Sequence, residues 1–292
     1  MIGRSGGSSS SGRHMVTAEG RLKMKSILLY ANADSGLNSR IEAALALAEA
    51  EHGHLTCLQA IPYDSYIFTD PFGGVYSLPA VLEKLEEKKA ATRRQVEERL
   101  RASQVQWSWL DYVGDPAPLL VERSRLADMI VLSLPDSEEP DRTAALTADV
   151  AVHARSLTLA VPAASRRLDP FGRALVAWNG SPESSNALRL ALPMLKQAGA
   201  VDVLSVSEDD DADFPATQAC EYLGYHGIRS ELHESRPGER TVAQAILDCA
   251  GELDAAYIVM GAYGHSRMRE AVLGGVTRTM LRQADRPLLL GH

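Results

Sequence analysis

Four glycines fall within fifteen residues near the carboxyl end of the chain: Gly261, Gly264, Gly274 and Gly275. They follow the apolar run 255–260, which has the composition of a buried strand, and they lead into a segment with helical character. Glycine lets the backbone approach a ligand closely, and the start of a helix presents unpaired N–H groups and the positive end of the helix dipole. The segment therefore predicts a cradle for a phosphate group.

The composition limits the classes of protein to consider. The chain has 292 residues, of which 45% are hydrophobic and 23% charged, enough for one large or two ordinary domains. A net charge of -8 without a sustained Lys/Arg block argues against nucleic acid as a partner. Neither a long apolar run nor a signal-peptide pattern is present, so we expect no membrane association and a cytoplasmic location. Cys57, Cys220 and Cys249 are far apart, which is typical of reduced core thiols.

A duplication organises the chain. Residues 1–23, rich in Gly and Ser, are expected to be an expression leader without ordered structure. After them the run 26–31 ends at Asn32 and is followed by an alanine-rich helical stretch; the run 173–178 ends at Asn179 and is followed by another helix. The two asparagines lie 147 positions apart. So long a repeat predicts two domains of one design, over residues 24–164 and 169–292.

Each half shows the same order of apolar runs and helical stretches. Second, third, fourth and fifth strands are predicted at 55–60, 106–113, 129–133 and 157–161 in the first half, and at 201–206, 229–234, 257–261 and 288–290 in the second. Strands that alternate with helices of ten or more residues favour a parallel sheet with helices on both faces. The predicted fold class is α/β, with two tandem Rossmann-like domains that each hold five parallel strands.

The halves differ in two places. The first half carries about nineteen extra residues, including the aromatic segment 62–79, for which interdomain packing and a lid over a pocket are both open interpretations. Where the second half has its glycines, the first has Leu134-Pro-Asp-Ser-Glu-Glu-Pro-Asp141, with four acids and no glycine. Carboxylates repel phosphate and proline lacks a donor, so the first half is not expected to bind a nucleotide in this way.

The strand ending in Met260-Gly261, followed by Gly264, nine residues and Gly274, resembles the G-x2-G-x9-G-[ST] nucleotide loop of the universal stress protein family. The second half is similar to that family throughout, and the first half is similar in the order of its elements. The resemblance implies a tandem universal stress protein, with domains of the adenine nucleotide alpha hydrolase-like class. It also implies that the two halves dock on each other as a built-in pseudo-dimer, while a homodimer of two chains stays open.

The resemblance further implies a set of ligand-binding residues. Asn179 would contact the adenosine, Val206 would line the adenine pocket, Met260 and Gly261 would close over the nucleoside, and the glycines would hold phosphates. Two positions depart from the family pattern: Asn179 stands where an acid is common, and Gly275 stands where a Ser or Thr is usual. The full predicted set is Asn179, Val206, Met260, Gly261, Gly264, Ser266, Gly274, Gly275 and Val276.

Three functions remain open at this point. The first is a stress-response protein that binds ATP, with or without Mg²⁺, in its second half and regulates through its conformation; because the loop has no Walker lysine, only slow hydrolysis is compatible with it. The second is an interaction protein that binds no nucleotide and acts through partner surfaces or another small ligand. The third is a nucleotide hydrolase or transferase that uses His265, although no nucleophile pattern accompanies it. We predict no catalytic residue and no metal ligand, since His226 and His233 have no Cys partner nearby.

Overall fold

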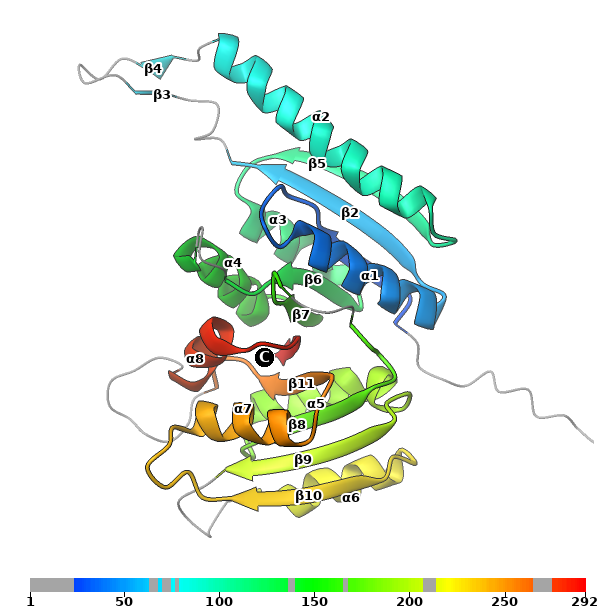
Figure 1. Ribbon diagram of the computed structural model, residues 1–292, viewed down its shortest axis with the longest axis vertical. Coiled ribbons are helices and arrows are strands. Elements are labelled where there is room, and N and C mark those ends of the chain that lie inside the picture. Colours follow the sequence, from blue (N-terminus) through cyan, green and yellow to red (C-terminus); the bar gives the residue numbers. More distant parts are fainter. Residues whose placement is uncertain are drawn as a thin grey trace, which may run out of the picture.

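The computed structural model describes residues 24–62, 68–69, 75–76, 79–135, 140–164, 168–206, 214–264 and 275–292. The expected leader, most of the aromatic segment and part of the glycine loop lie outside these residues. Within them, the chain forms two successive sets of strands and helices around one sheet (Figure 1).

The first half contains seven strands and four α-helices among the described residues. In chain order they are β1 (Ser26–Tyr30), α1 (Leu37–Glu51), β2 (His54–Ile61), β3 (Phe68–Thr69), β4 (Val75–Tyr76), α2 (Pro79–Arg101), β5 (Gln106–Val113), α3 (Pro116–Arg123), β6 (Met129–Ser133), α4 (Pro140–His153) and β7 (Leu157–Val161). The predicted helix after β5 is split, because a 3-10 turn over Ser124–Leu126 replaces its last turn.

The second half repeats this order without the insertion. It consists of β8 (Arg173–Trp178), α5 (Pro182–Leu195), β9 (Ala200–Val206), α6 (Ala216–Tyr225), β10 (Ser230–Ser235), α7 (Val242–Glu252), β11 (Tyr257–Gly261), α8 (Gly275–Gln283) and β12 (Leu288–Gly291). Polar residues cap the starts of α5 and α7: the side chains of Ser181 and Thr241 accept hydrogen bonds from the backbone N–H groups of Ser184 and Gln244.

Ten strands join into a single sheet. Its order is β10-β9-β8-β11-β12-β7-β6-β1-β2-β5, so each half contributes five strands in equivalent positions. All neighbours within a half are parallel, as the sequence predicts. The exception is the seam between the halves, where β12 and β7 run antiparallel. The expected docking of the two halves therefore takes the form of edge-strand pairing, and the chain ends in the middle of the molecule (Figure 1).

The hydrophobic core also crosses the seam. One cluster of buried residues includes Ile41 and Leu47 of α1, Leu159 of β7, Leu192 of α5 and Leu289 of β12, and so joins both halves on one side of the sheet. Helices α4 and α8 lie side by side across the seam, where Arg282 pairs with Asp141 at 2.6 Å (Figure 1). The two halves therefore share packing as well as backbone hydrogen bonds.

We predict that Leu289→Ala destabilises both halves together. Leu289 is fully buried and faces Leu159 in the register of the seam, so its truncation should cost about 2–5 kcal/mol. Urea unfolding followed by tryptophan fluorescence tests this, because Trp107 and Trp109 report on the first half and Trp178 on the second. Leu126→Ala, at a site that is 90% exposed, is the matched control. Two separate transitions, of which only one moves, would contradict the shared core.

Candidate functional site

The candidate site lies at a reversal of strand order in the second half. From β8 the chain first proceeds outward to β9 and β10, and then crosses back so that β11 pairs with the opposite edge of β8. In folds of this kind the connections that follow two such strands diverge, and we refer to the region at the carboxyl ends of β8 and β11 as the crevice of the second half. In open α/β sheets this is the place where ligands bind.

The predicted residues of three strands meet at this crevice. Trp178 pairs with Ser205 and Ala177 with Met260, so Asn179, Val206 and Gly261 follow neighbouring strand ends. Asn179 is exposed, Val206 and Gly261 are partly buried, and the side chain of Met260 lies in the core. The register of the sheet thus brings together the strand ends that carry Asn179, Val206, Met260 and Gly261, although Asn179 and Gly261 lie 82 positions apart in the sequence.

The turn after β8 is tightly fixed. The side chain of Asn179 accepts a hydrogen bond from the backbone N–H of Ser181 at 3.2 Å, and Gly180 has a φ of 73°, a conformation that favours glycine. Trp178 is buried and its indole N–H donates to the carbonyl of Phe214 at 3.2 Å. Trp178 therefore belongs to the hydrophobic core.

Two of the predicted glycines lie against the start of α5. A Cβ at Gly261 would come within 2.6 Å of the Ser184 nitrogen, and one at Gly264 would come within 2.6 Å of Glu183 Oε2. Gly261 therefore needs glycine for close packing of helix on strand, independently of any ligand, whereas a side chain at Gly264 would meet the movable end of Glu183. The same absence of side chains leaves their backbone accessible from the crevice.

The loop after β11 is held at its beginning. The N–H of Ala262 donates to the carbonyl of Gly291 at 2.8 Å, and the N–H of Tyr263 donates to Thr277 Oγ1 at 3.1 Å. Tyr263 has a φ of 53°, and burial raises the pKa of its hydroxyl. These contacts anchor the described part of the loop to β12 and α8.

The remaining predicted residues lie on α8 or outside the described part. Gly275 is the first residue of α8 and is exposed, with open space where a Cβ would be. Val276 follows it and is also exposed. Ser266 and Gly274 lie outside the described residues, as does His265, the base considered for an enzymatic reaction.

Comparison with known proteins relates the carboxyl-terminal part of the chain to a known family. A model described as the universal stress protein family matches residues 227–291, a span that contains the glycine loop and the last three strands. The second half carries a universal stress protein domain. No curated protein sequence matches this chain.

Solved structures extend the likeness to the whole fold. A universal stress protein from Archaeoglobus fulgidus covers 92% of this chain and 97% of its own, with 18% identity and a TM-score of 0.72. A functionally unknown protein from Pseudomonas aeruginosa covers 92% of each chain, with 18% identity and a TM-score of 0.58. Single-domain members match about half of the chain; one of them is a universal stress protein in complex with cAMP, with 18% identity, 49% and 100% coverage and a TM-score of 0.36. The tandem arrangement of two universal stress protein-like folds is thus confirmed at the level of the fold.

The equivalent crevice of the first half is filled by an arginine. Arg40 of α1 is 1% exposed, and it donates to the carbonyls of Tyr30 and Asn32, to Asp34 Oδ1 at 2.8 Å and to Ser133 Oγ at 2.5 Å. Asn32 thus acts through its backbone as part of the turn. The sequence predicted an inactive first site from its acidic loop, but it missed this internal ion pair.

A regularity in the sequence could have revealed the arginine. At the separation of 147 residues that relates the first strands, Arg40 corresponds to Ala187 and Gly36 corresponds to Glu183. Arg40 is a charged residue buried among the alanines and leucines of α1, where Glu51 at the last position of the helix is the other buried charge. A charge at such a position indicates a buried partner, which here is Asp34.

A second polar cluster lies on strands β8, β9 and β10. Ligand atoms of Asp202, Glu231 and His233 lie within 4.8 Å of one another. Asp202, although 1% exposed, is fully paired, because Arg173 and His233 each approach one of its carboxylate oxygens to 2.9 Å. His226, which the sequence considered together with His233, contacts Tyr222 instead. We interpret the cluster as an internal ion-pair network that fixes the edge of the sheet.

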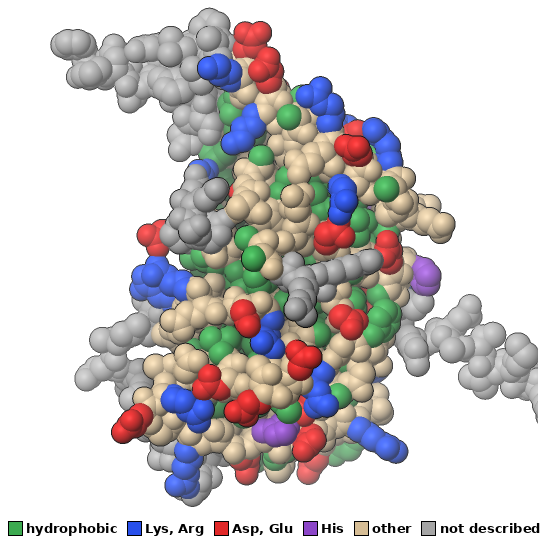
Figure 2. Space-filling view, in the orientation of Figure 1, with side chains coloured by type: hydrophobic (Ala, Val, Ile, Leu, Met, Phe, Trp, Pro, Cys, Tyr) green, Lys and Arg blue, Asp and Glu red, His purple; other side chains and the backbone are tan. Residues whose placement is uncertain are grey.

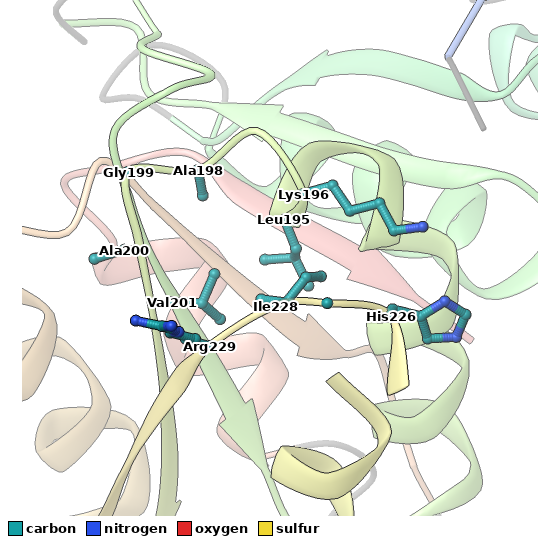
Figure 3. Close-up of a pocket in the computed structure, with 10 residues that line it drawn as sticks. Leu195, Lys196, Ala198, Gly199, Ala200, Val201, His226, Ile228 and Arg229 are labelled. Atoms are coloured by element: carbon teal, nitrogen blue, oxygen red, sulfur yellow. The ribbon is translucent and has the colours of Figure 1, made fainter. Parts of the chain in front are cut away.

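A hollow of roughly 380 Å³ lies at the opposite end of β9 from the glycine loop (Figure 3). It is bordered by the last residues of α5 and α6, where helix carbonyls disfavour an anion. The charged ends of Lys196 and Arg229 point away from each other (Figure 3). The hollow therefore offers no convergent set of groups for a ligand.

On the visible face, the described residues form no basic patch of the kind that binds nucleic acid. Among the described residues, Lys and Arg side chains are interspersed there with those of Asp and Glu (Figure 2). In the described part of the chain, none of the helices has the length and apolar character needed to cross a membrane.

We predict that Arg40→Met destabilises the first half by about 2–4 kcal/mol, because it removes the ion-pair partner of Asp34 and the arginine donor of the Tyr30 and Asn32 carbonyls. Urea unfolding measures the loss. Arg94→Met, on the exposed side of α2, makes the same chemical change without a buried partner and should alter the stability by less than about 0.5 kcal/mol. Equal effects of the two substitutions would show that the buried ion pair contributes nothing.

Proposed function

We propose that this protein binds an adenine nucleotide, ATP, in the crevice of its second half and acts as a stress-response regulator. The two domains of this proposal span residues 24–164 and 169–292. The observation that carries the proposal is the convergence of Asn179, Val206 and Gly261 at the reversal of strand order, directly before a glycine loop.

The roles of the residues follow the resemblance to the family. Asn179 would contact the adenosine with its free amide group, since its carbonyl oxygen already accepts from Ser181. Val206 would border the adenine, and the backbone around Met260 and Gly261 would close over the nucleoside. The phosphates would lie on N–H groups of the loop and of the first turn of α8, where the helix dipole favours an anion. The residues assigned to the phosphates are Gly264, Ser266, Gly274, Gly275 and Val276.

This arrangement is better suited to regulation by nucleotide binding than to nucleotide hydrolysis. A ligand that bridges β8, β11 and α8 stabilises the folded form that binds it and orders the loop between β11 and α8. Because β11 pairs with β12, and β12 pairs with β7 of the first half, such a change would be transmitted to the seam. The loop has no Walker lysine, so any hydrolysis of ATP would be slow.

One observation favours the second function, that of an interaction protein that binds no nucleotide. Gly261 is explained by its packing against the backbone of α5, so it would be a glycine even if the site were closed. The two interpretations differ in a direct observable, namely whether nucleotide is bound.

We predict that the purified protein releases an adenine nucleotide on denaturation, seen by absorbance at 260 nm and mass spectrometry, or that added ATP raises its melting temperature. Saturation at about 100 times Kd adds about 2.7 kcal/mol to the stability. Gly264→Val should abolish this effect, because its side chain would meet the carboxylate of Glu183. A change at Ser137, in the acidic loop of the first half, should leave it intact. The absence of both bound nucleotide and ATP-induced stabilisation would rule out the proposal in favour of the interaction protein.

We predict that Gly275→Ser strengthens ATP binding by about three- to tenfold, which is within the net value of about 0.5–1.5 kcal/mol for one additional hydrogen bond. The substitution restores the hydroxyl that the family pattern has at this position. A Cβ at Gly275 meets no atom within 4 Å, so the change carries no steric cost among the described residues. Isothermal titration calorimetry measures the affinity. Gly224→Ser, whose Cβ on α6 is equally unobstructed, is the control and should leave the affinity unchanged.

A further inference from the structure

The buried carboxylate of Glu183 has no partner. Glu183 is 8% exposed, and its Oε2 is buried without a hydrogen bond from any residue that the structure describes. An ionised carboxylate that loses water without gaining a partner costs several kcal/mol. Asp202 is buried to a similar degree but is paired with both Arg173 and His233. The contrast marks Glu183 as a group whose partner comes from outside the described chain.

The position of Glu183 links it to the nucleotide crevice. It is the second residue of α5, and its Oε2 lies 2.6 Å from the place of a Cβ on Gly264. The Oγ of Ser181 is 3.3 Å from the same point. The carboxylate therefore borders the glycine loop, on the side where the phosphates of a bound nucleotide would lie.

The helix accounts for only part of the stabilisation that the charge needs. The positive end of the α5 dipole favours a negative charge in the first turn by about 0.3–1 kcal/mol, and by about 2 kcal/mol in buried geometries. By the same argument, Glu183 already occupies the anion position at the start of α5. A phosphate in the neighbouring loop would bring a second negative charge close to it in a partly buried place, where such repulsion is poorly screened.

We propose that Glu183 ligates a divalent cation, Mg²⁺, that enters with the nucleotide, so that this site takes the metal–nucleotide complex rather than the free nucleotide. The inference rests on the proposed function. Mg²⁺ in proteins is commonly held by one or two carboxylates together with substrate phosphates and several waters, and one carboxylate beside a phosphate loop supplies that set. The cation satisfies Oε2 and removes the repulsion between the carboxylate and the phosphates.

The first half differs in the charge that its crevice holds and in how that charge is neutralised. Its crevice holds the cation Arg40, which is neutralised within the chain by Asp34 and needs no ligand. The crevice of the second half holds an anion, and no described side chain forms an ion pair with it. Under this proposal the positive charge for the second crevice comes with the ligand.

Isothermal titration calorimetry on the full-length protein tests the proposal, with ATP titrated in excess Mg²⁺ or in EDTA and adenosine titrated as a ligand without phosphate. For the wild type we expect Mg²⁺ to tighten ATP binding at least about tenfold. In Glu183→Gln the charge is removed, so free ATP should bind at least as tightly as to the wild type and the effect of Mg²⁺ should fall below about threefold. Adenosine should bind both proteins equally.

A control variant and the possible results show whether the role of Glu183, the nucleotide site or both proposals fail. Glu221→Gln makes the same change on an exposed position of α6 and should keep the full Mg²⁺ dependence. Wild-type binding of ATP that is equal in Mg²⁺ and EDTA would overturn the role of Glu183 but leave the nucleotide site standing. Equal weakening of adenosine and ATP binding in Glu183→Gln, with the tenfold effect of Mg²⁺ on ATP retained, would overturn the proposal and identify Glu183 as a hydrogen-bond acceptor for the nucleoside instead. Failure of the wild type to bind either ligand would overturn both proposals.

Discussion

The antiparallel pairing of β7 with β12 is the interaction on which the rest of the structure depends. Each half, taken alone, would end in an exposed and strongly apolar edge strand, which is a liability in water. Pairing these strands removes both edges at once, joins ten strands into one sheet and lets a single hydrophobic cluster extend from α1 to α6. The two crevices are consequently held at fixed positions on either side of the seam.

The two crevices have diverged in charge while keeping their backbone. In the first, Gly36 leaves room for Ser133, and Arg40 fills the remaining space with an ion pair. In the second the arrangement is reversed, because Gly261 on the strand leaves room for Glu183 on the helix. At this contact each half has a glycine on one element and a side chain on the other: Gly36 faces Ser133, and Gly261 faces Glu183. The first half adds Arg40, which forms an ion pair with Asp34.

Much of the fold could be predicted from the sequence because its signals are local. The buried strands read as continuous apolar runs, and the repeat separation of 147 residues aligned the strand ends at Asn32 and Asn179. Of the candidate site, the sequence predicted the residues at the strand ends from the glycine spacing and the family resemblance. It missed Arg40 and Glu183, since a charge in the first turns of a helix is normally a solvated or capping group.

The sequence by itself determined the class of fold, the duplication and the asymmetry between the glycine loop and its acidic counterpart, because each depends on residue types at fixed spacing along the chain. Only the tertiary structure decided that the halves share one sheet, that Trp178 belongs to the core, and that Arg40 is paired whereas Glu183 is not. These features depend on which atoms lie within a few ångströms after the chain has folded. Hydrogen bonding and desolvation act over that distance, and the spacing of residues in a sequence does not measure it.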